Sequence, residues 1–435
     1  MIVMTSFISI AQAMQKGTGS VQVRGWIYRE RGSAKIKFIV LRDATNIIQC
    51  VIEKAVVGEE SFLIADKLHV EASLEITGEI KPDTRAPTGY EIAVKSFTLI
   101  GDSVDFPLQK DQSFDFLLDN RHLYLRSRKM TAILKIRSTV FGAIHEYFRS
   151  EGFYEYHSPL FQATQAEGGS TLFTVDYFGE KVFLAQTWQL YAEPAIFALE
   201  KIYTIAPSFR AEKSKTSRHL TEYWHAEMEG AWFDFKTVID HGEGLLKHVV
   251  KKVLEKNQEE LTLLNRDVSK LLPTIEKPFP RMTYTEALKI LKEKNNLEID
   301  WGKDLRTIEE DELVKNYDVP IIVTHYPKIV KAFYMKEPVD NPDVVLGCDF
   351  LAPEGYGEII GGSQREEDLE KVKARLIAQG ENPEHYQFYL DTRKYGSVPH
   401  GGFGLGVERI VSWICGLDNI KDAIPFPRTM NRFKP

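Results

Sequence analysis

The stretch from Phe209 to Glu229 reads FRAEKSKTSRHLTEYWHAEME and predicts a hairpin at the centre of the fold. Side chains alternate between the two faces of a strand, so Arg210 and Glu212 are expected on one face of the first strand. A basic loop follows, and the chain then returns as a second strand. One face of that strand is expected to carry Tyr223, His225, Glu227 and Glu229. The stretch therefore predicts an antiparallel strand pair with charged and aromatic side chains on a shared face.

This hairpin carries side chains that suit a nucleotide. Arg210 offers a guanidinium that binds phosphate through two parallel hydrogen bonds, and the ring of Tyr223 offers a stacking surface for a base. Glu212 offers a carboxylate that accepts from an amino group. The loop adds Lys213, Lys215, Arg218 and His219. The alternative is a charged hairpin on a solvated sheet face, which carboxylates opposite Trp224 and Met228 also fit.

A second informative segment, GGFGLGVERIVSW, runs from Gly401 to Trp413. Its glycines alternate and no obvious strand precedes them, so it departs from the G-x-G-x-x-G pattern of dinucleotide sites. Glu408 and Arg409 follow at an expected helix start. This order predicts that Arg409 lies where a backbone comes close to a ligand. A helix packed against a tight turn is the alternative, but it does not explain the adjacent arginine.

A third segment, DFLAPEGYGEIIGGSQR from Asp349 to Arg365, contains closely spaced carboxylates. Asp349 and Glu358, with Glu354 between them, are candidate ligands for Mg²⁺, a hard cation that prefers oxygen ligands and substrate phosphates. The alternative is a solvated acidic loop, which is the more common setting for a pair of carboxylates.

The first hundred residues predict a small β-barrel. Runs rich in Val, Ile and Phe, separated by polar residues, Gly or Pro, are expected as strands over Val21–Tyr28, Lys35–Arg42, Ile47–Glu53, Ser73–Ile80 and Glu91–Leu99. Apolar residues at helical spacing predict a helix over Val57–Leu68. Five strands with one inserted helix is the order of an OB-fold, which binds oligonucleotides on one face. A barrel used only for packing is the alternative.

The remainder of the chain predicts an α+β domain. Residues 101–128 are polar and contain Pro and Asp, as in a linker. Helical spacing then predicts helices over Met130–Arg149, Thr237–Leu264 and Gln364–Gln379. Short strands are expected at Lys181–Ala185, Lys201–Ala206, Thr221–Phe233, Pro320–Thr324 and Glu358–Gly361. Because strands and helices do not alternate regularly, an antiparallel sheet flanked by helices is favoured over a doubly wound parallel sheet.

Composition and charge exclude several classes of protein. The 435 residues suffice for two or three domains, and 43% hydrophobic with 27% charged residues argue against a disordered or fibrous chain. Three widely separated cysteines predict neither a disulfide framework nor a cysteine-rich zinc site, and indicate a reducing compartment. No apolar run approaches the ~20 residues of a membrane span. The N-terminal residues lack the basic flank and A-x-A site of a signal peptide.

The net charge of −7, from 55 Lys+Arg and 62 Asp+Glu, argues at first sight against a nucleic-acid partner. It does not exclude one, because binding follows the local field of one face rather than the sum over the chain. Arg29, Arg31, Lys35 and Lys37 are expected where RNA approaches the barrel, so a locally positive face is predicted there.

In their order along the chain, these segments resemble the motifs of the class II aminoacyl-tRNA synthetases. Phe209–Glu212 resembles motif 2, Gly404–Arg409 resembles motif 3, and the helix leading to Pro159 resembles motif 1, which forms the dimer interface in this class. The domain order, with an OB-fold ahead of the catalytic domain, resembles that of the subgroup of synthetases for Asp, Asn and Lys. The resemblance implies an anticodon-binding OB-fold over 1–102, a hinge over 103–129 and a class II catalytic domain over 130–435. It also implies a cytoplasmic homodimer.

The resemblance implies an ATP-dependent ligase that joins an amino acid to tRNA through an aminoacyl-adenylate, releasing AMP and pyrophosphate. The nucleophilic carboxylate is already ionised, so rate must come from alignment and from neutralising charge at phosphorus. Arg210 is implied at the α-phosphate, Glu212 at the adenine amino group and Tyr223 on the adenine ring. The full set implied in ATP binding is Arg210, Glu212, Arg218, His219, Tyr223, Glu358 and Arg409. Arg210 and Arg409 are implied as catalytic, and Asp349 and Glu358 as ligands of Mg²⁺.

Within the subgroup, the residues favour asparagine as the substrate. Ala192 stands where the similar aspartate enzymes supply a lysine, and Glu227 stands where they usually carry a shorter Asp. Glu227 accepting from an amide nitrogen and Arg365 donating to the amide oxygen satisfy an asparagine side chain, whereas aspartate meets a like charge. Glu167 and Gln189 are implied at the α-amino group. The expected reaction is the ligation of asparagine to tRNA(Asn) through asparaginyl-adenylate.

The OB-fold then reads the anticodon, because Phe38 and Gln49 match the positions at which this subgroup stacks and pairs the central uridine. Phe38 as an ordinary barrel residue is the alternative. Three other functions stay open: an aspartyl-tRNA synthetase, including one that charges both tRNAs; an ammonia-dependent asparagine synthetase; and a non-catalytic relative that binds RNA or a protein. Ala192 and Glu227 argue against the first, the OB-fold against the second, and the retained motif arginines and metal carboxylates against the third.

Overall fold

The computed structural model describes residues 6–166, 171–213 and 216–434. The chain divides into two compact units, Met1–Ser113 and Phe114–Pro435. Among the described residues, no helix is both long and apolar enough to cross a membrane. The three cysteines are buried free thiols.

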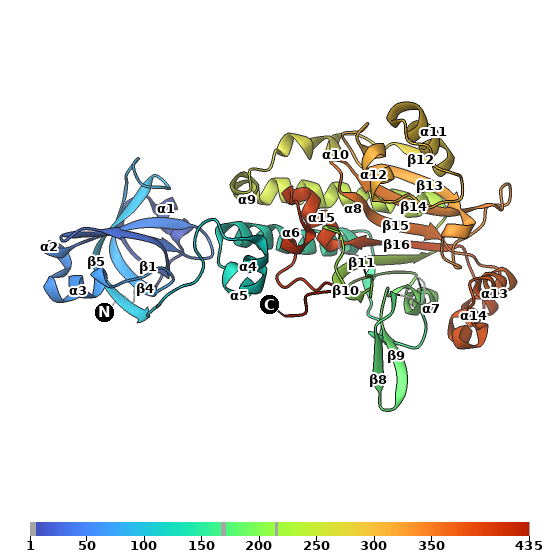
Figure 1. Cartoon of the computed structure of the whole chain (residues 1–435), viewed down its shortest axis with the longest axis horizontal. Helices are drawn as coiled ribbons and strands as arrows, with labels where there is room; N and C mark the ends of the chain where they lie inside the picture. The colour runs from blue at the N-terminus through green and yellow to red at the C-terminus, as the bar shows by residue number, and fades with distance from the viewer. Residues whose placement is uncertain (1–5, 167–170, 214–215, 435) are drawn as a thin grey trace. The chain divides into compact units, whose positions relative to one another are not determined.

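The first unit is a closed five-stranded barrel, which confirms the predicted OB-fold. Its strands are β1 (Gly19–Gly32), β2 (Ile36–Arg42), β3 (Ile47–Glu53), β4 (Ser73–Pro82) and β5 (Tyr90–Gly101), in the spatial order β1-β2-β3-β5-β4. Helix α1 (Ile10–Lys16) precedes the barrel, and α2 (Lys54–Val57) and α3 (Glu59–Asp66) lie between β3 and β4 (Figure 1). Burial alternates along β2, where Ile39 and Leu41 enter the core while Phe38 and Val40 point outward.

The second unit is built on an eight-stranded sheet in the order β12-β13-β14-β15-β16-β11-β10-β6 (Figure 1). These strands are β6 (Tyr154–Glu155), β10 (Lys201–Phe209), β11 (Glu222–Ala231), β12 (Arg281–Thr283), β13 (Ile321–Pro327), β14 (Val344–Ala352), β15 (Gly357–Gln364) and β16 (His400–Gly406). The outer pairs β12–β13 and β10–β6 are parallel, and the pairs between them are antiparallel. The predicted antiparallel sheet is thus confirmed for its centre. A separate small sheet has the order β7-β9-β8, with β7 (Phe161–Gln162), β8 (Thr174–Tyr177) and β9 (Glu180–Leu184).

Helices flank the large sheet. The main core joins the sheet to α6 (Arg128–Ser150), α8 (Phe235–Lys256), α9 (Gln258–Leu263) and α15 (Val407–Cys415). Helix α7 (Gln189–Leu199) packs on β10 and β11 through a separate cluster that includes Ala192, Ile196 and Ile202. The remaining α-helices are α4 (Phe114–Asp119), α5 (Arg121–Tyr124), α10 (Leu272–Glu276), α11 (Tyr284–Asn295), α12 (Thr307–Val314), α13 (Leu369–Ala378) and α14 (Gln387–Lys394).

The segment predicted as a hinge, 103–129, differs in its second half. Residues 114–124 form α4 and α5 and belong to the second unit. Arg121 is fully buried there, pairs with Asp422 at 3.0 Å and donates to the backbone oxygens of Lys421, Ile424 and Pro425. The polar composition that indicated a linker includes a charged side chain that holds the segment in place.

Two predicted helices have different bounds. The helix expected over Thr237–Leu264 is divided at Asn257, where φ of −123° departs from helical geometry. The helix expected over Gln364–Gln379 begins at Leu369, because the Asp368 side chain caps it by accepting from two backbone N–H groups. Gln364 instead ends β15.

The alternating glycines form a central strand that the sequence did not reveal. Gly401 to Gly406 lie in β16, between β15 and β11, so the tight turn of the alternative interpretation is wrong. A Cβ at Gly402 would lie 2.1 Å from the backbone oxygen of Met228, and one at Gly404 would lie 2.3 Å from Nε2 of His225. Glycine is required here because neighbouring groups occupy the space of a side chain.

Candidate active site

Two adjoining cavities lie along β11, β16 and β15. All seven residues implied in ATP binding line the first: Arg210, Glu212, Arg218, His219, Tyr223, Glu358 and Arg409. The second has a volume of about 490 Å³ and is lined by Gln189, Glu227, Asp349, Glu358 and Arg365 among others. Arg210, His225, Glu358 and Gly404 line both, so the cavities form one continuous site. Glu167 lies outside the described residues.

Motif-2 side chains meet at the first cavity although the strand is shorter than expected. Strand β10 ends at Phe209, so Arg210 and Glu212 follow it rather than share one of its faces. The Arg210 guanidinium lies 5.8 Å from the centre of the Tyr223 ring and 3.9 Å from the Glu212 carboxylate. A cation, an aromatic ring and a carboxylate therefore face one cavity, as a nucleotide requires.

His219 lies beside Glu212, with its Nε2 3.5 Å from a carboxylate oxygen. Burial lowers the pKa of His219, and the Glu212 carboxylate opposes this while the guanidinium groups of Arg409, Arg210 and Arg218 reinforce it. A neutral imidazole is thus favoured among the arginines. It keeps one ring N–H available as a hydrogen-bond donor.

Arg218 is anchored from outside the hairpin. Its Nη2 lies 2.8 Å from both carboxylate oxygens of Asp311 on α12, and it also donates to the backbone oxygen of Gly355. The side chain lines the first cavity while it holds this ion pair. Of the loop lysines, Lys213 is exposed, and Lys215 lies outside the described residues.

Motif-3 residues are fixed at the start of α15. Arg409 donates to the backbone oxygen of Glu358 at 2.6 Å, and its Nη1 lies 3.4 Å from the Glu358 carboxylate. Burial raises the pKa of Glu358, but Arg409, Lys331 and Arg210 outweigh this and hold the pKa below its ordinary value. The site therefore keeps an ionised carboxylate next to the arginine.

The neighbouring Glu408 ties together the three segments that resemble motifs 1, 2 and 3. Its carboxylate accepts from the backbone N–H of Trp224 on β11 at 2.9 Å and lies 2.7 Å from Arg137 on α6. The helix that presents Arg409 is thereby locked to the sheet and to α6.

Asp349 and Glu358 are positioned to share a cation. A Cβ added at Gly361 would lie 2.7 Å from one Glu358 carboxylate oxygen and 3.7 Å from one of Asp349, so both carboxylates flank this glycine. Lys331 takes the other Asp349 oxygen at 2.7 Å. Burial raises the pKa of Asp349 to about 6, with Lys331 opposing and Glu358 adding to the rise. Crowded carboxylates of this kind are the oxygen ligands that suit Mg²⁺.

Glu354 does not join that pair, which corrects its expected place between them. Its carboxylate binds Arg266 through hydrogen bonds of 2.9 and 2.6 Å, and Lys270 lies 3.3 Å away.

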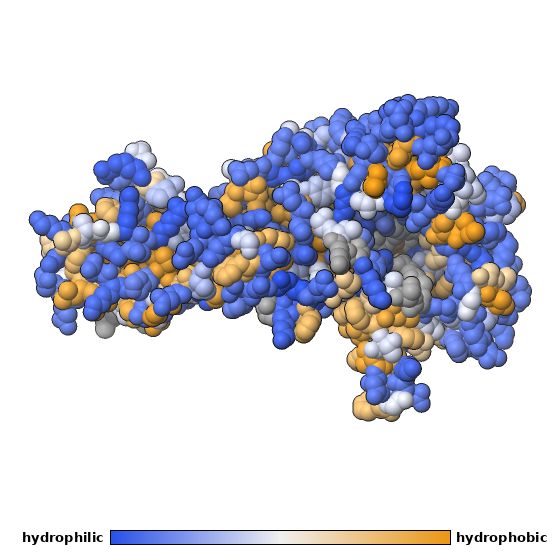
Figure 2. All heavy atoms as spheres, viewed as in Figure 1, coloured by the Kyte–Doolittle hydropathy of each residue, from blue (hydrophilic) through white to orange (hydrophobic). Residues whose placement is uncertain are grey.

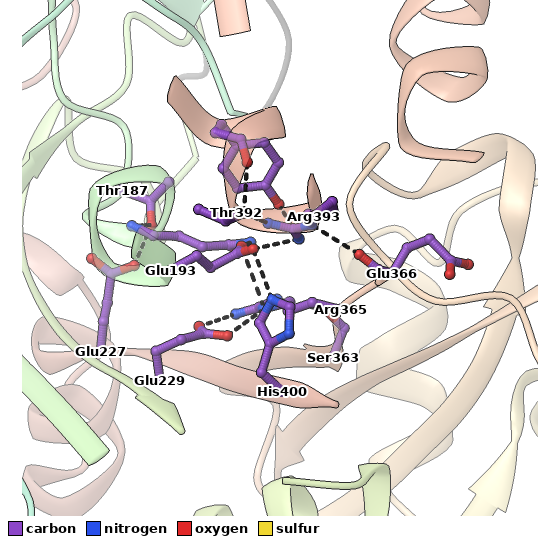
Figure 3. A network of polar contacts seen from close by, with 12 residues as sticks. Thr187, Glu193, Glu227, Glu229, Ser363, Arg365, Glu366, Thr392, Arg393 and His400 are labelled. Atoms are coloured by element: carbon purple, nitrogen blue, oxygen red, sulfur yellow. Dashed lines mark hydrogen bonds and ion pairs between the residues drawn. The ribbon is translucent and has the colours of Figure 1, made fainter. Parts of the chain in front are cut away.

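The second cavity presents an anion and a cation that are both held by neighbours. Glu227 accepts from the Thr187 hydroxyl and from the Trp188 backbone N–H at 2.9 Å. Burial raises the pKa of Glu227, but nearby His225 and these hydrogen bonds outweigh it, so the pKa is lowered and the group is ionised. Arg365 donates to Glu229 at 3.0 and 2.8 Å and to Ser363 at 2.6 Å (Figure 3).

Several buried charges around the site were not predicted. Lys331 has no sequence signal, because its role depends on Asp349 from a distant strand. Glu193 on α7, Arg393 on α14 and His400 on β16 gather behind the second cavity (Figure 3). The signal for Glu193 is a carboxylate within the otherwise apolar helix sequence QLYAEPAIFAL. Glu193, Glu229 and His400 lie close enough to hold a metal, but the guanidinium groups of Arg365 and Arg393 already supply the positive charge there.

Comparison with known proteins agrees with this geometry. The sequence profile of tRNA synthetases class II (D, K and N) matches residues 113–430. The chain belongs to that family. A profile of OB-fold nucleic acid binding domains matches residues 21–100 of this synthetase.

The similar relatives of the synthetase include asparagine–tRNA ligases. It is 49% identical to that of Thermoplasma acidophilum over 430 residues, 98% of this chain and 100% of the relative. It is 47% identical to that of Thermococcus kodakarensis over 415 residues, 95% of this chain and 96% of the relative. The solved asparaginyl-tRNA synthetase of Pyrococcus horikoshii complexed with asparaginyl-adenylate superposes with a TM-score of 0.96 at 44% identity, covering 99% and 100% of the two chains.

The OB-fold of the synthetase carries Phe38 and Gln49 on one face. Phe38 pairs with Val51, and Val40 pairs with Gln49, which places all four side chains on the same side of β2 and β3. The Arg31 guanidinium lies 5.0 Å from the centre of the Phe38 ring, and Gln49 donates to Glu91 at 3.0 Å.

Lys37 was expected on the basic face of the barrel, but its side chain points to the other side of β2 from Phe38. It is only 5% exposed and pairs with Glu30 at 2.6 Å. The cations that share the face of Phe38 are Arg29 and Arg31, both exposed, while Lys35 is exposed just before β2.

Proposed function

We propose that the protein joins asparagine to tRNA(Asn) through an asparaginyl-adenylate, consuming ATP. The observation that carries the proposal is that the ionised Glu227 and the guanidinium of Arg365 line the same cavity. Oε1 of Glu227, which accepts from the Thr187 hydroxyl, keeps a lone pair for an amide N–H, and Arg365 uses three of its five N–H donors on protein groups. Ala192 is buried and supplies no cation.

Aspartate is disfavoured by the same geometry. Its side chain carries a charge of the same sign as the ionised Glu227 and offers no N–H to that carboxylate. A site built to hydrogen-bond one polar group rejects the analogue that lacks it, because the buried partner is left unsatisfied. The similarity to asparagine–tRNA ligases at 47–49% identity supports the same assignment.

In the first step, an oxygen of the asparagine α-carboxylate attacks the α-phosphorus of ATP. The new bond is the mixed anhydride of the adenylate, and the bond to the β-phosphate oxygen breaks to release pyrophosphate. Arg210 neutralises charge at the α-phosphate, while Tyr223 and Glu212 hold the adenine. Arg409 and His219 hold the γ-phosphate, so alignment and charge neutralisation supply the rate.

Mg²⁺ held by Asp349 and Glu358 would neutralise phosphate charge when bound. Gln189 and Glu167 hold the α-amino group of the substrate. In the second step, a ribose hydroxyl of the terminal tRNA adenosine attacks the carbonyl carbon, and AMP leaves. Phe38 and Gln49 read the anticodon at the barrel.

The assembly that we propose is a cytoplasmic homodimer formed through α6 and the segment that follows it. Apolar side chains exposed near this segment support it, since unpartnered patches mark interaction sites. They include Tyr154, Leu160, Phe161, Tyr177 and the 94%-exposed Phe178. Figure 2 shows hydrophobic residues gathered over the small sheet that contains β8 and β9. Size-exclusion chromatography with light scattering is expected to give a molar mass twice that of one chain.

The test of the function is ATP–pyrophosphate exchange with asparagine, aspartate and lysine supplied separately, followed by charging of tRNA(Asn). We expect exchange with asparagine to exceed exchange with aspartate by at least about a hundredfold, from the unsatisfied and like-charged groups that aspartate meets. Faster exchange with aspartate would end the assignment. ATP-dependent formation of asparagine from aspartate and ammonia, without tRNA charging, would point instead to an asparagine synthetase.

A further inference from the structure

A buried ionic cluster lies behind the second cavity and touches two of its substrate-facing residues. We define it as Glu193, Glu229, Arg365 and Arg393 (Figure 3). All four side chains are buried, and Glu193 and Arg393 come from α7 and α14. Arg365 lines the cavity and Glu193 does not, so Glu193 can reach the substrate only through others.

Glu193 is the hub of this cluster. One of its oxygens accepts from Gln189 at 2.8 Å and lies 4.0 Å from Nε of Arg365. The other oxygen pairs with Arg393 and lies 3.1 Å from Nε2 of His400. Gln189 and Glu193 are one turn apart on α7, which places both on one helix face. The Glu193 carboxylate therefore orients the Gln189 side chain through a hydrogen bond, and the same carboxylate lies next to the guanidinium of Arg365.

The cluster contains two carboxylates and two guanidinium groups, so its formal charge is zero. Burial raises the pKa of Glu229, and Arg365 opposes this rise; both Glu229 oxygens accept from the Arg365 guanidinium at 3.0 and 2.8 Å, the geometry of an ionised carboxylate bound by two parallel hydrogen bonds. Burial raises the pKa of Glu193, but Arg393, the adjacent His400 and Arg365 outweigh burial and hold the pKa below its ordinary value. Balance matters here, because an unbalanced guanidinium at this place attracts the carboxylate of aspartate more strongly than the neutral amide oxygen of asparagine.

We propose that Glu193 is a positioning and specificity-determining residue that suppresses aspartate by neutralising the cluster around Arg365 while holding Gln189. This inference rests on the proposed function. Removing its charge leaves the cluster at +1, which strengthens binding of an anionic side chain relative to a neutral one. Removing the charge of Arg393 instead leaves the cluster at −1, which weakens binding of an anionic side chain relative to a neutral one. Removing both restores zero.

The test measures kcat/KM for asparagine and for aspartate in ATP–pyrophosphate exchange with the full-length protein. The readout is the ratio of the two values, which does not depend on how much of a preparation is folded. Glu193→Gln is expected to lower the asparagine-to-aspartate ratio by about tenfold or more, because one unit of charge in a desolvated site acts strongly on an ionised ligand. The KM for asparagine should rise more than kcat falls, since Gln189 and Arg365 act in binding.

Three matched variants separate charge from packing. Glu193→Asp keeps the charge and is expected to keep the ratio near that of the wild type even if KM rises. Arg393→Met should raise the ratio or leave it no lower than in the wild type. The double variant Glu193→Gln/Arg393→Met should return the ratio toward the wild-type value. A purely structural cluster predicts equal losses for both amino acids in every variant.

An unchanged ratio in Glu193→Gln, or a double variant whose ratio is no higher than that of Glu193→Gln, would overturn the inference. The wild-type protein, measured in the same series, tests the proposed function separately. If the wild type activates aspartate in preference to asparagine, the function fails. If it prefers asparagine but the ratio does not respond to the cluster charge, only the role of Glu193 fails.

Discussion

At the scale of single residues, the site depends on an absent side chain as much as on those present. The Cβ that Gly404→Ala introduces would lie 2.3 Å from Nε2 and 2.6 Å from Cε1 of His225. His225 lies 3.4 Å from Glu227 and lines both cavities, so displacing its ring disturbs both ends of the site. We expect Gly404→Ala to lower kcat/KM in pyrophosphate exchange by about a hundredfold, since misplacement by about 1 Å has costs of this size.

Gly347→Ala is the matched control for this prediction. It is another strand glycine of the same sheet, and its added Cβ would meet the flexible tip of Met335 at 3.1 Å. A thioether can shift to make room, so activity is expected to stay within about threefold of the wild type. Equal activity losses in the two variants would show that the His225 contact does not matter.

At the scale of elements, the sequence predicted the strands whose residues have high β-propensity. It missed a strand whose position depends on contacts with the adjacent strand. The five barrel strands are rich in β-branched residues with alternating burial, and they were found. Strand β16 consists mostly of glycine, which disfavours a strand locally; its place is set by the backbone of Met228 and the ring of His225 on β11. No local pattern contains that information.

The site followed the same division. Residues within the three recognised segments, such as Arg210, Glu227 and Arg409, were predicted and line the cavities. Their supports were missed, because Lys331 and Arg393 act through partners far away in the sequence. Short motifs encode groups that face a ligand, whereas long-range packing determines which charges balance them.

Helix α8 offers a stability prediction that belongs to an element. Its N-cap Asp234 accepts from the Thr237 backbone N–H at 2.8 Å and from the Thr237 hydroxyl at 2.6 Å. Asp234→Ala is expected to lower the free energy of unfolding by about 1 kcal/mol. Calorimetry should show the transition of the second unit about 1 to 2 °C lower at pH 7.

The stability lost in Asp234→Ala is expected to depend on pH, and the hydrogen bonds of the N-cap determine the direction of this dependence. The hydrogen bonds from the Thr237 side chain and backbone lower the pKa of Asp234 in the folded protein. The stability that the carboxylate contributes is therefore fully present above its unfolded pKa of about 3.9, and is lost as pH falls through the lower folded value. The gap between wild type and Asp234→Ala should narrow on acidification. Asp234→Asn keeps an acceptor and should lose less at pH 7; a gap that widens in acid would contradict the assignment.

At the scale of the whole molecule, a net charge of −7 coexists with a barrel face that carries Arg29, Arg31 and Phe38. Register pairs Arg31 with Phe38 and Arg29 with Val40, so both cations share the face of Phe38 and Gln49. The negative sum is taken over all 435 residues, so it does not describe the local field that RNA meets at this face.

We therefore expect tRNA binding to weaken as salt rises, and the slope of log K against log salt to report the contacts of this face. Each phosphate neutralised contributes about −0.7 to −0.9 to that slope. Arg29→Ala/Arg31→Ala should make the slope shallower by about 1 to 2. Lys54→Ala/Lys67→Ala, on and next to the barrel helices, lowers the net charge by the same two units, from −7 to −9, and should leave the slope unchanged. If both double variants shifted the slope equally, the total charge rather than this face would govern binding. If only the arginine variant shifts the slope, the position of two cations matters more for RNA binding than the sum over 117 charged side chains, 55 basic and 62 acidic.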